Sequence, residues 1–101
     1  MENKNVYDVQ EIKYRLEPVF NENGVKSAIL FGSYARGYAT GESDVDILVD
    51  SGLRGLDFVG LIERVREALN KNVDLIDAHY INAGSPIENE VATTGVWIYG
   101  Q

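Results

Sequence analysis

The fold of this chain is decided by residues 32–50, which read GSYARGYATGESDVDILVD. The mainly apolar run at 45–49, VDILV, predicts a well-covered strand, and the run at 25–31, VKSAILF, predicts a second buried strand. The segment between the two runs is too short for a crossover that would bring the chain back in parallel. We therefore expect these two strands to be antiparallel.

Helices and strands are predicted to alternate along the rest of the chain. Apolar residues at helical spacing predict a helix over 8–23, with a kink or break at Pro18, and a helix that follows the loop at 51–55 and reaches Leu69. The remaining elements are helical turns at 33–39, a strand at 73–78, a helix that starts at the capping box Ser85-Pro86-Ile87-Glu88 and ends at Gly95, and a strand at 96–99. This order predicts an α/β fold of the α+β type, in which residues 1–101 form one domain with a mixed sheet flanked by helices.

The composition excludes several classes of protein. Of 101 residues, 16 are Asp or Glu and 9 are Lys or Arg, a formal charge of −7, whereas a general nucleic-acid binder needs a basic surface. Cysteine is absent, which excludes disulfide scaffolds and thiolate metal sites. No apolar run approaches the roughly 20 residues of a membrane span, and the polar start does not resemble a signal peptide. We therefore expect a cytoplasmic protein with no membrane contact.

Three acidic residues are predicted to meet at one end of the sheet. The strands at 45–49 and 73–77 are joined by a helix, so they should be parallel neighbours that begin at the same end. Asp44 and Asp46 project to the same face because they are two residues apart, and Asp74 can face them across the parallel pair. This geometry selects three carboxylates from the sixteen acidic residues.

A cation and an anion are both predicted to bind near these carboxylates. Neighbouring carboxylates repel one another, and an all-oxygen set without His or Cys suits Mg²⁺ or Mn²⁺. The antiparallel strand brings Gly32 and Ser33 to the same end, where Gly32 permits close backbone approach and Ser33 opens a helical turn whose free N–H groups attract anions. Together these features predict a site for a nucleoside triphosphate. A Walker A loop is excluded because Tyr38-Ala39 stand where Lys and Ser or Thr are required.

The motif resembles that of a known superfamily. Gly32-Ser33, ten further residues and then Asp44-Val45-Asp46 match the G-S-x10-D-x-D signature of the DNA polymerase β-like nucleotidyltransferases. The whole run at 32–50 is similar to the minimal nucleotidyltransferase (MNT) branch, whose small members are often paired with a helical HEPN toxin. Because VDLIDA at 73–78 is similar to the segment that bears the third carboxylate of the family, the resemblance covers nearly the whole chain. It implies the single-domain nucleotidyltransferase fold.

The resemblance also implies an activity and a role for each residue of the motif. Asp44, Asp46 and Asp74 would hold two metal ions, with Asp74 helping to deprotonate the attacking hydroxyl, and Gly32 and Ser33 would hold the β and γ phosphates of ATP or another NTP. In the MNT branch the resemblance implies transfer of AMP to a tyrosine of the HEPN partner, which silences that RNase toxin.

Two other functions stay open at this point. An antitoxin that neutralises a basic partner by contact alone would also suit the charge of −7. Nucleotidyl transfer to a small molecule such as an aminoglycoside would need the acceptor domain of larger family members. The sequence does not decide the nucleotide, the acceptor, the activity without a partner or the oligomeric state.

Five further residues are interpreted from their positions alone. Arg36 contacts phosphate or a partner, or else lies in a surface ion pair. Arg54, in a glycine-flanked loop, could reach a triphosphate, and Tyr34 and Tyr38 either stack on a base or partner or pack against the protein. Asp77 has the opposite parity to Asp74 and should point away from it.

Overall fold

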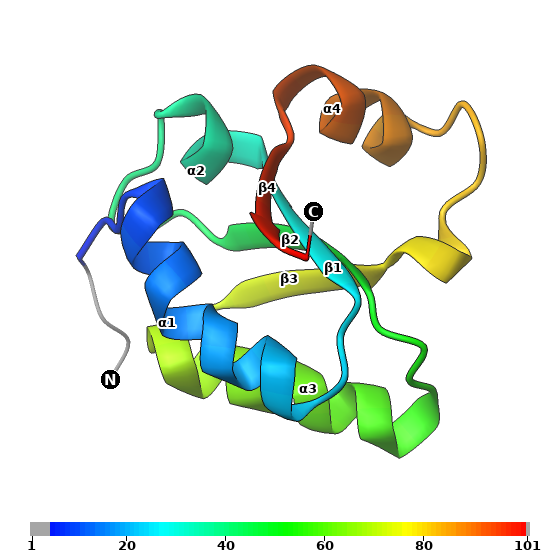
Figure 1. Cartoon of the computed structure of the whole chain (residues 1–101). Helices are drawn as coiled ribbons and strands as arrows, with labels where there is room; N and C mark the ends of the chain where they lie inside the picture. The colour runs from blue at the N-terminus through cyan, green and yellow to red at the C-terminus, as the bar shows by residue number, and fades with distance from the viewer. Residues whose placement is uncertain (1–4, 101) are drawn as a thin grey trace.

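The computed structural model describes residues 5–100 (Figure 1). Its elements follow in the order α1 (Val9–Glu22), β1 (Ser27–Phe31), α2 (Gly32–Arg36), β2 (Val45–Asp50), α3 (Gly55–Leu69), β3 (Val73–Asp77), the 3₁₀ turn η1 (Ala78–Tyr80), α4 (Pro86–Thr94) and β4 (Val96–Tyr99). This alternation confirms the α+β fold class. The break that Pro18 could cause is absent, because α1 continues through this residue. Pro18 is exposed, so the helix carbonyl that it leaves without a donor can be hydrated.

The four strands form one mixed sheet in the order β3-β2-β1-β4. β1 is antiparallel to β2 and to β4, and β2 is parallel to β3, as the sequence predicts. The end of β1 and the beginnings of β2 and β3 therefore lie together. We call this the aspartate end of the sheet (Phe31, Val45, Val73), and the other end, where β2 and β3 finish, the distal end (Asp50, Asp77).

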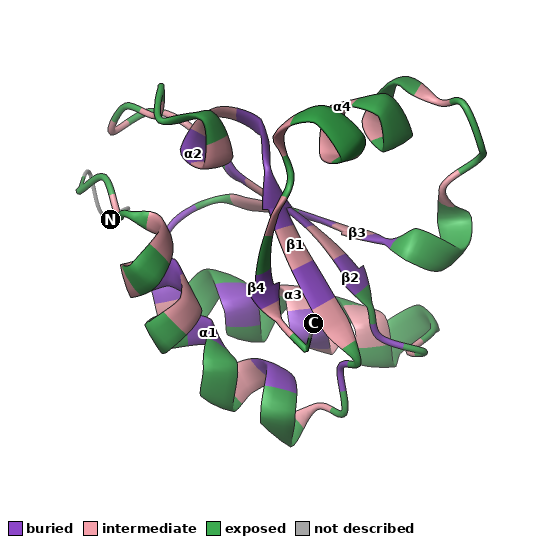
Figure 2. Cartoon of the chain, turned by 45° about the horizontal axis from the view of Figure 1, so that its top comes forward, coloured by how far each residue is buried: buried purple, intermediate pink, exposed green. Residues whose placement is uncertain are grey.

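Helices α1 and α3 cover one face of the sheet and enclose the core (Figures 1 and 2). Alternate residues of the strands point into this layer, and Leu30, Ile47 and Val49 are fully buried there. Burying each side chain of this kind contributes roughly 1.5–3 kcal/mol to stability. The helices contribute the buried residues Ile12, Leu16, Phe20, Leu61, Val65 and Leu69.

The opposite face of the sheet is only partly covered. Helices α2 and α4 lie over it, and α4 has no buried residue, so it shows no purple in Figure 2. The hydroxyl of Ser85 caps α4 by accepting the N–H of Glu88 at 3.2 Å, as the capping box predicts. At the other end of α4, Gly95 packs against β1, where an added Cβ would lie 2.8 Å from Ile29. Residues on this face are therefore accessible to ligands.

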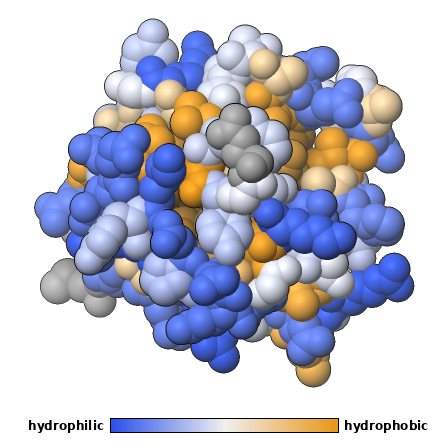
Figure 3. Space-filling view, viewed as in Figure 1, coloured by the Kyte–Doolittle hydropathy of each residue, from blue (hydrophilic) through white to orange (hydrophobic). Residues whose placement is uncertain are grey.

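The face of the molecule drawn in Figure 3 is mostly hydrophilic. Figure 3 shows hydrophilic residues around the margin of one face and hydrophobic residues gathered in its upper half, on the side of α2 and α4. Among residues 5–100 no helix combines the length and the apolar character that a membrane crossing requires.

Candidate functional site

Three aspartates stand at the aspartate end of the sheet. Asp46 and Asp74 are direct Cα partners in the parallel ladder between β2 and β3, so their Cα atoms lie roughly 4.8 Å apart on the same face. Asp44 lies two residues before Asp46, just outside β2. Asp46 is half-buried, whereas Asp44 and Asp74 are exposed. The expected position of Asp46 beside Asp74 is confirmed.

Gly32 lies against Asp46 from the other side. Phe31, the last residue of β1, pairs with Asp46 in the antiparallel ladder, and the chain then turns at once into α2. Gly32 has φ +73°, and a Cβ added there would collide with the carboxylate of Asp46, 3.2 Å from its Cγ. Glycine is the residue that permits both the left-handed turn and this close approach.

The charge around Asp46 is strongly negative. Burial is the largest cause that raises the pKa of Asp46 from 3.8 to about 6, and the charges of Asp74, Glu90 and Asp44 raise it further, in that order. A carboxylate in such surroundings gains more than an isolated one from a proton or a cation beside it. The site therefore favours a positively charged ligand.

Glu90 is the member of this group that the sequence did not single out. It is a half-buried residue of α4, and its charge affects Asp46 more than the charge of Asp44 does. The capping box predicts that a helix exists at this place in the chain. It carries no signal for the face of the sheet that the helix covers, so it could not identify Glu90.

Ser33 and Arg36 belong to the short helix α2. Ser33 lies in its first turn, next to Gly32, and the N-cap residue Phe31 supplies no side-chain hydrogen bond to that turn. Arg36 is exposed in the last turn, and its guanidinium carbon lies 5.4 Å from the centre of the Tyr38 ring. The structure thus brings Gly32 and Ser33 to the aspartate end, while Arg36 lies about 4.5 Å further along the helix axis than Ser33.

This combination of a Gly-Ser turn and paired aspartates has a counterpart among known families. Residues 14–101 match the family model described as polymerase beta, nucleotidyltransferase. The chain belongs to this family. It is a nucleotidyltransferase of the minimal type, as the resemblance of its motif implies.

Two relatives of this nucleotidyltransferase come from Methanocaldococcus jannaschii, and both are provisionally named protein adenylyltransferases. One is 40% identical over 77 residues, which cover 74% of this chain and 83% of the relative. The other is 37% identical over 78 residues, which cover 72% of this chain and 78% of the relative.

Solved structures share the fold. A crystal structure described as a toxin-antitoxin with AMP-PNP has a TM-score of 0.76 and 26% identity, and the match covers 88% of this chain and 73% of that one. A structure provisionally described as a minimal nucleotidyltransferase has a TM-score of 0.71 and 26% identity, with 89% of this chain and 95% of that one covered. The nucleotidyltransferase fold is therefore confirmed over most of the chain.

The donor set of this nucleotidyltransferase fits a divalent cation. It consists of carboxylate oxygens, which Mg²⁺ and Mn²⁺ prefer. Burial first and then the charges of Asp74, Glu90 and Asp44 raise the pKa of Asp46, and a bound cation would offset these charges. Within residues 5–100, no three acidic, histidine or cysteine side chains are gathered closely enough to hold one ion. The exposed side chains of Asp44 and Asp74 would therefore have to turn toward Asp46 to share a metal ion with it.

Three residues with open interpretations lie in different surroundings. Arg54 immediately precedes α3 at the distal end, so it does not stand beside the Gly-Ser turn as a contact with triphosphate would require. Tyr34 is 5% exposed and packs in the core, whereas Tyr38 is 72% exposed. Of the two tyrosines, Tyr38 is thus accessible to a ligand or a partner.

Asp77 points to the packed face of the sheet, as its parity predicts. It is 3% exposed, and its carboxylate accepts hydrogen bonds from the hydroxyl and N–H of Ser51 and from the N–H of His79. Burial would raise its pKa, but these hydrogen bonds, with that of the Ser51 hydroxyl foremost, hold the pKa below 3.8. Asp77 therefore stays ionised and ties the loop after β2 to the end of β3.

Proposed function

We propose that this nucleotidyltransferase transfers AMP from ATP to a hydroxyl of a partner protein, in a reaction that depends on Mg²⁺ or Mn²⁺. The observation that carries the proposal is the ladder pairing of Asp46 with Asp74 beside Gly32. This pairing puts two carboxylates next to the turn that the family motif assigns to the phosphates.

The relatives support the choice of nucleotide and partner. Two of them bear provisional names as protein adenylyltransferases. The similar structure with AMP-PNP, an ATP analogue, is a toxin-antitoxin structure. We accordingly propose that the partner is a helical HEPN-type toxin and that this chain is its cytoplasmic antitoxin.

Each residue of the site has a task in the proposed reaction. Asp44, Asp46 and Asp74 hold the metal ions, and Gly32 and Ser33 bind the β and γ phosphates, with Arg36 as a further phosphate contact. When bound, the ions neutralise charge on the phosphates and on the leaving pyrophosphate.

The transfer itself exchanges one bond at phosphorus for another. The acceptor oxygen forms a bond to the α-phosphorus while the bond from that phosphorus to pyrophosphate breaks. The hydroxyl proton passes to a carboxylate, and Asp74 is the proposed acceptor because it is exposed on the open face. Positioning and electrostatics supply most of the rate, since the protein forms no covalent bond to the substrate.

The test is the intact mass of the partner. The protein is incubated with a candidate helical HEPN-type toxin, ATP and Mg²⁺, and the toxin is then measured by mass spectrometry. We expect a mass gain equal to one or more AMP groups, lost in Asp46→Asn and in Asp74→Asn. Asp50→Asn is the matched control, because it removes one carboxylate from the same strand at the distal end.

The charge of −7 favours a second candidate, an antitoxin that acts by contact alone. The same experiment separates the two functions. If Asp46→Asn still neutralises the toxin and the mass of the partner never changes, the contact mechanism replaces the enzymatic one.

A further inference from the structure

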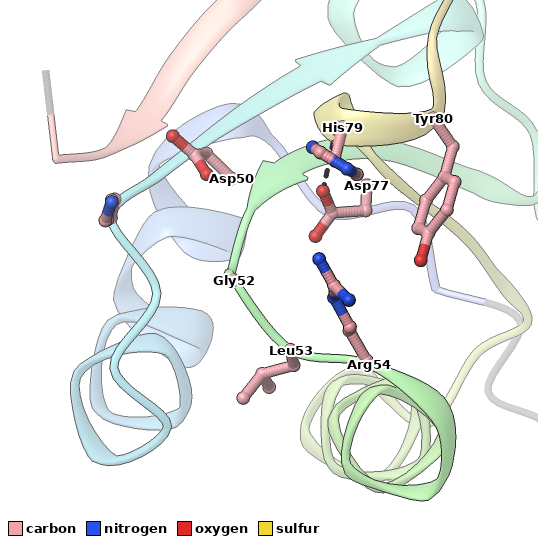
Figure 4. A pocket seen from close by; sticks show the side chains of 8 residues that line it. Asp50, Gly52, Leu53, Arg54, Asp77, His79 and Tyr80 are labelled. Atoms are coloured by element: carbon pink, nitrogen blue, oxygen red, sulfur yellow. Dashed lines mark hydrogen bonds between the residues drawn. The ribbon is translucent and has the colours of Figure 1, made fainter.

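A pocket of about 230 Å³ lies at the distal end of the sheet (Figure 4). It is formed by Lys26 before β1, by the loop after β2 that ends at Arg54, and by the end of β3 with His79 and Tyr80 of η1. The residues of the proposed nucleotide site are absent from its lining. With roughly 3.3 Å per strand residue, the two places are on the order of 13 Å apart along β2.

Three basic side chains from three separate segments surround this pocket. They are Lys26, Arg54 and His79, the single histidine of the chain. Within the described part of the chain, none of the three forms an ion pair within 4.0 Å. The lining thus gathers two cationic side chains, those of Lys26 and Arg54, and one imidazole, together with the carboxylates of Asp50 and Asp77.

Two carboxylates also line the pocket, but one of them is already engaged. Both oxygens of Asp77 accept hydrogen bonds, one from Ser51 and the other from the N–H of His79. Figure 4 shows the guanidinium of Arg54 pointing toward this carboxylate and the imidazole of His79 on its other side. The hydrogen bond from the N–H of His79 fixes the backbone of that residue at the pocket, and Asp50 is the remaining, exposed acid.

The backbone adds positive character to the same place. Helix α3 begins here, it is 15 residues long, and its N-cap Arg54 makes no side-chain cap hydrogen bond. The first N–H groups of a long helix carry partial positive charge and attract anions. The helix terminus thus adds to the charges of Lys26 and Arg54, against the carboxylates of Asp50 and Asp77 in the lining and of Asp57 in the first turn of α3.

We propose that this distal pocket binds a phosphoryl group, either as inorganic phosphate or as part of a nucleotide. A tetrahedral anion suits basic donors that approach from three directions. Tyr80 is 65% exposed, with its ring edge-on to that of His79 at 5.4 Å, and can contact a substituent of the phosphate. The proposal concerns a second site and does not depend on the activity proposed above.

His79 provides the measurement, because a single histidine gives one Hε1 resonance in the proton NMR spectrum. The protein, freed of divalent ions with EDTA, is titrated at constant pH and ionic strength with inorganic phosphate, AMP, adenosine or chloride. We expect saturable shifts of this resonance with phosphate and AMP but not with adenosine or chloride. Tighter binding of AMP than of phosphate assigns the site to nucleotides, and equal binding assigns it to free phosphate.

Matched variants locate the binding. Lys26→Gln and Arg54→Gln should each weaken phosphate binding by about tenfold or more, the usual effect of losing one charge-assisted hydrogen bond. Arg64→Gln removes an exposed charge of α3 outside the pocket and should have no effect, and Asp46→Asn should retain phosphate binding. The proposal is overturned if chloride shifts the resonance as phosphate does, or if the two pocket variants bind phosphate as tightly as Arg64→Gln.

Discussion

Gly32 leaves open the space into which the carboxylate of Asp46 projects. The two residues come from different strands, and the ladder pairing of Phe31 with Asp46 holds them together. The glycine and the second aspartate of the motif are therefore one structural unit. A side chain at Gly32 would displace Asp46 from its place beside Asp74.

We expect Gly32→Ala to lower the free energy of unfolding by roughly 2–5 kcal/mol, the sum of a left-handed alanine and an overpacked contact. Gly37→Ala is the matched control, because Gly37 has φ +83° and no atom within 4 Å of an added Cβ. It should lose only about 1–2 kcal/mol. Urea denaturation measures both values, and equal losses would show that the contact with Asp46 costs nothing.

The stability of the protein should fall as the pH rises from about 4 to about 6. The pKa of Asp46 in the folded state, about 6, exceeds its ordinary value of 3.8. The stabilisation by its proton is therefore complete below pH 4 and is lost as the pH rises through 6. For a buried group, this pKa shift would change the free energy of unfolding by about 3 kcal/mol. Asp46 is half-buried, and solvent screening reduces the change to about 1–2 kcal/mol. Denaturation across this pH range should show the decline in the wild type and in Asp50→Asn but not in Asp46→Asn.

Glu90→Gln should lower the pKa of Asp46, because the charge of Glu90 is one of the causes that raise it. We expect a decrease of a few tenths of a pH unit, about 0.5 kcal/mol for a partly screened charge. Carboxyl ¹³C NMR of Asp46 against pH measures the shift. Glu67→Gln, an exposed glutamate of α3, should leave the titration of Asp46 unchanged, and the same result for Glu90→Gln would contradict the position inferred for Glu90.

The contribution of Asp77 to stability should increase as the pH rises, in contrast to that of Asp46. Hydrogen bonds hold its pKa below 3.8, so its contribution is present above about pH 4 and is lost as the pH falls below it. Asp77→Asn should cost about 1–3 kcal/mol at pH 7, because donors from Ser51 and His79 lose their charged acceptor. Thermal unfolding at pH 7 and pH 3 tests this, and a penalty of the same size at both values would argue against an ionised Asp77.

Mg²⁺ should raise the unfolding temperature, since an ion that binds only the folded state stabilises it. Each kcal/mol of binding corresponds to about 4–8 °C in a domain of this size. EDTA should reverse the rise, and Asp46→Asn and Asp74→Asn should abolish it, whereas Asp50→Asn should keep it. Calorimetric scans with and without Mg²⁺ decide this, and a rise retained in both site variants would place the ion elsewhere.

Much of the fold could be predicted because local patterns and chain length leave few alternatives. The connection from Gly32 to Ser43 is too short for a parallel crossover, so β1 and β2 are expected to be antiparallel. The helix between the apolar runs of β2 and β3 indicates that these two strands are parallel. With the topology known, the period of two along a strand is enough to separate Asp46 and Asp74 from Asp77.

The positions of the remaining residues depend on tertiary packing, which local sequence patterns do not determine. The position of α4 over the open face brings Glu90 to Asp46, and the turn of the chain after β2 carries Arg54 to the distal end. The sequence predicts a kink or a break at Pro18, and the break does not occur because the exposed position of this residue allows the helix to continue.

Strand β3 is an edge of the sheet, and its two acids fix its alignment. A slip of one residue against β2 would turn Leu75 outward and drive Asp74 into the hydrocarbon layer, away from the donors that serve Asp77, at a cost of several kcal/mol. The same two charges discourage a strand of another molecule from adding to this border. Asp74 and Asp77 thus disfavour both a shifted register of β3 and aggregation through this edge of the sheet.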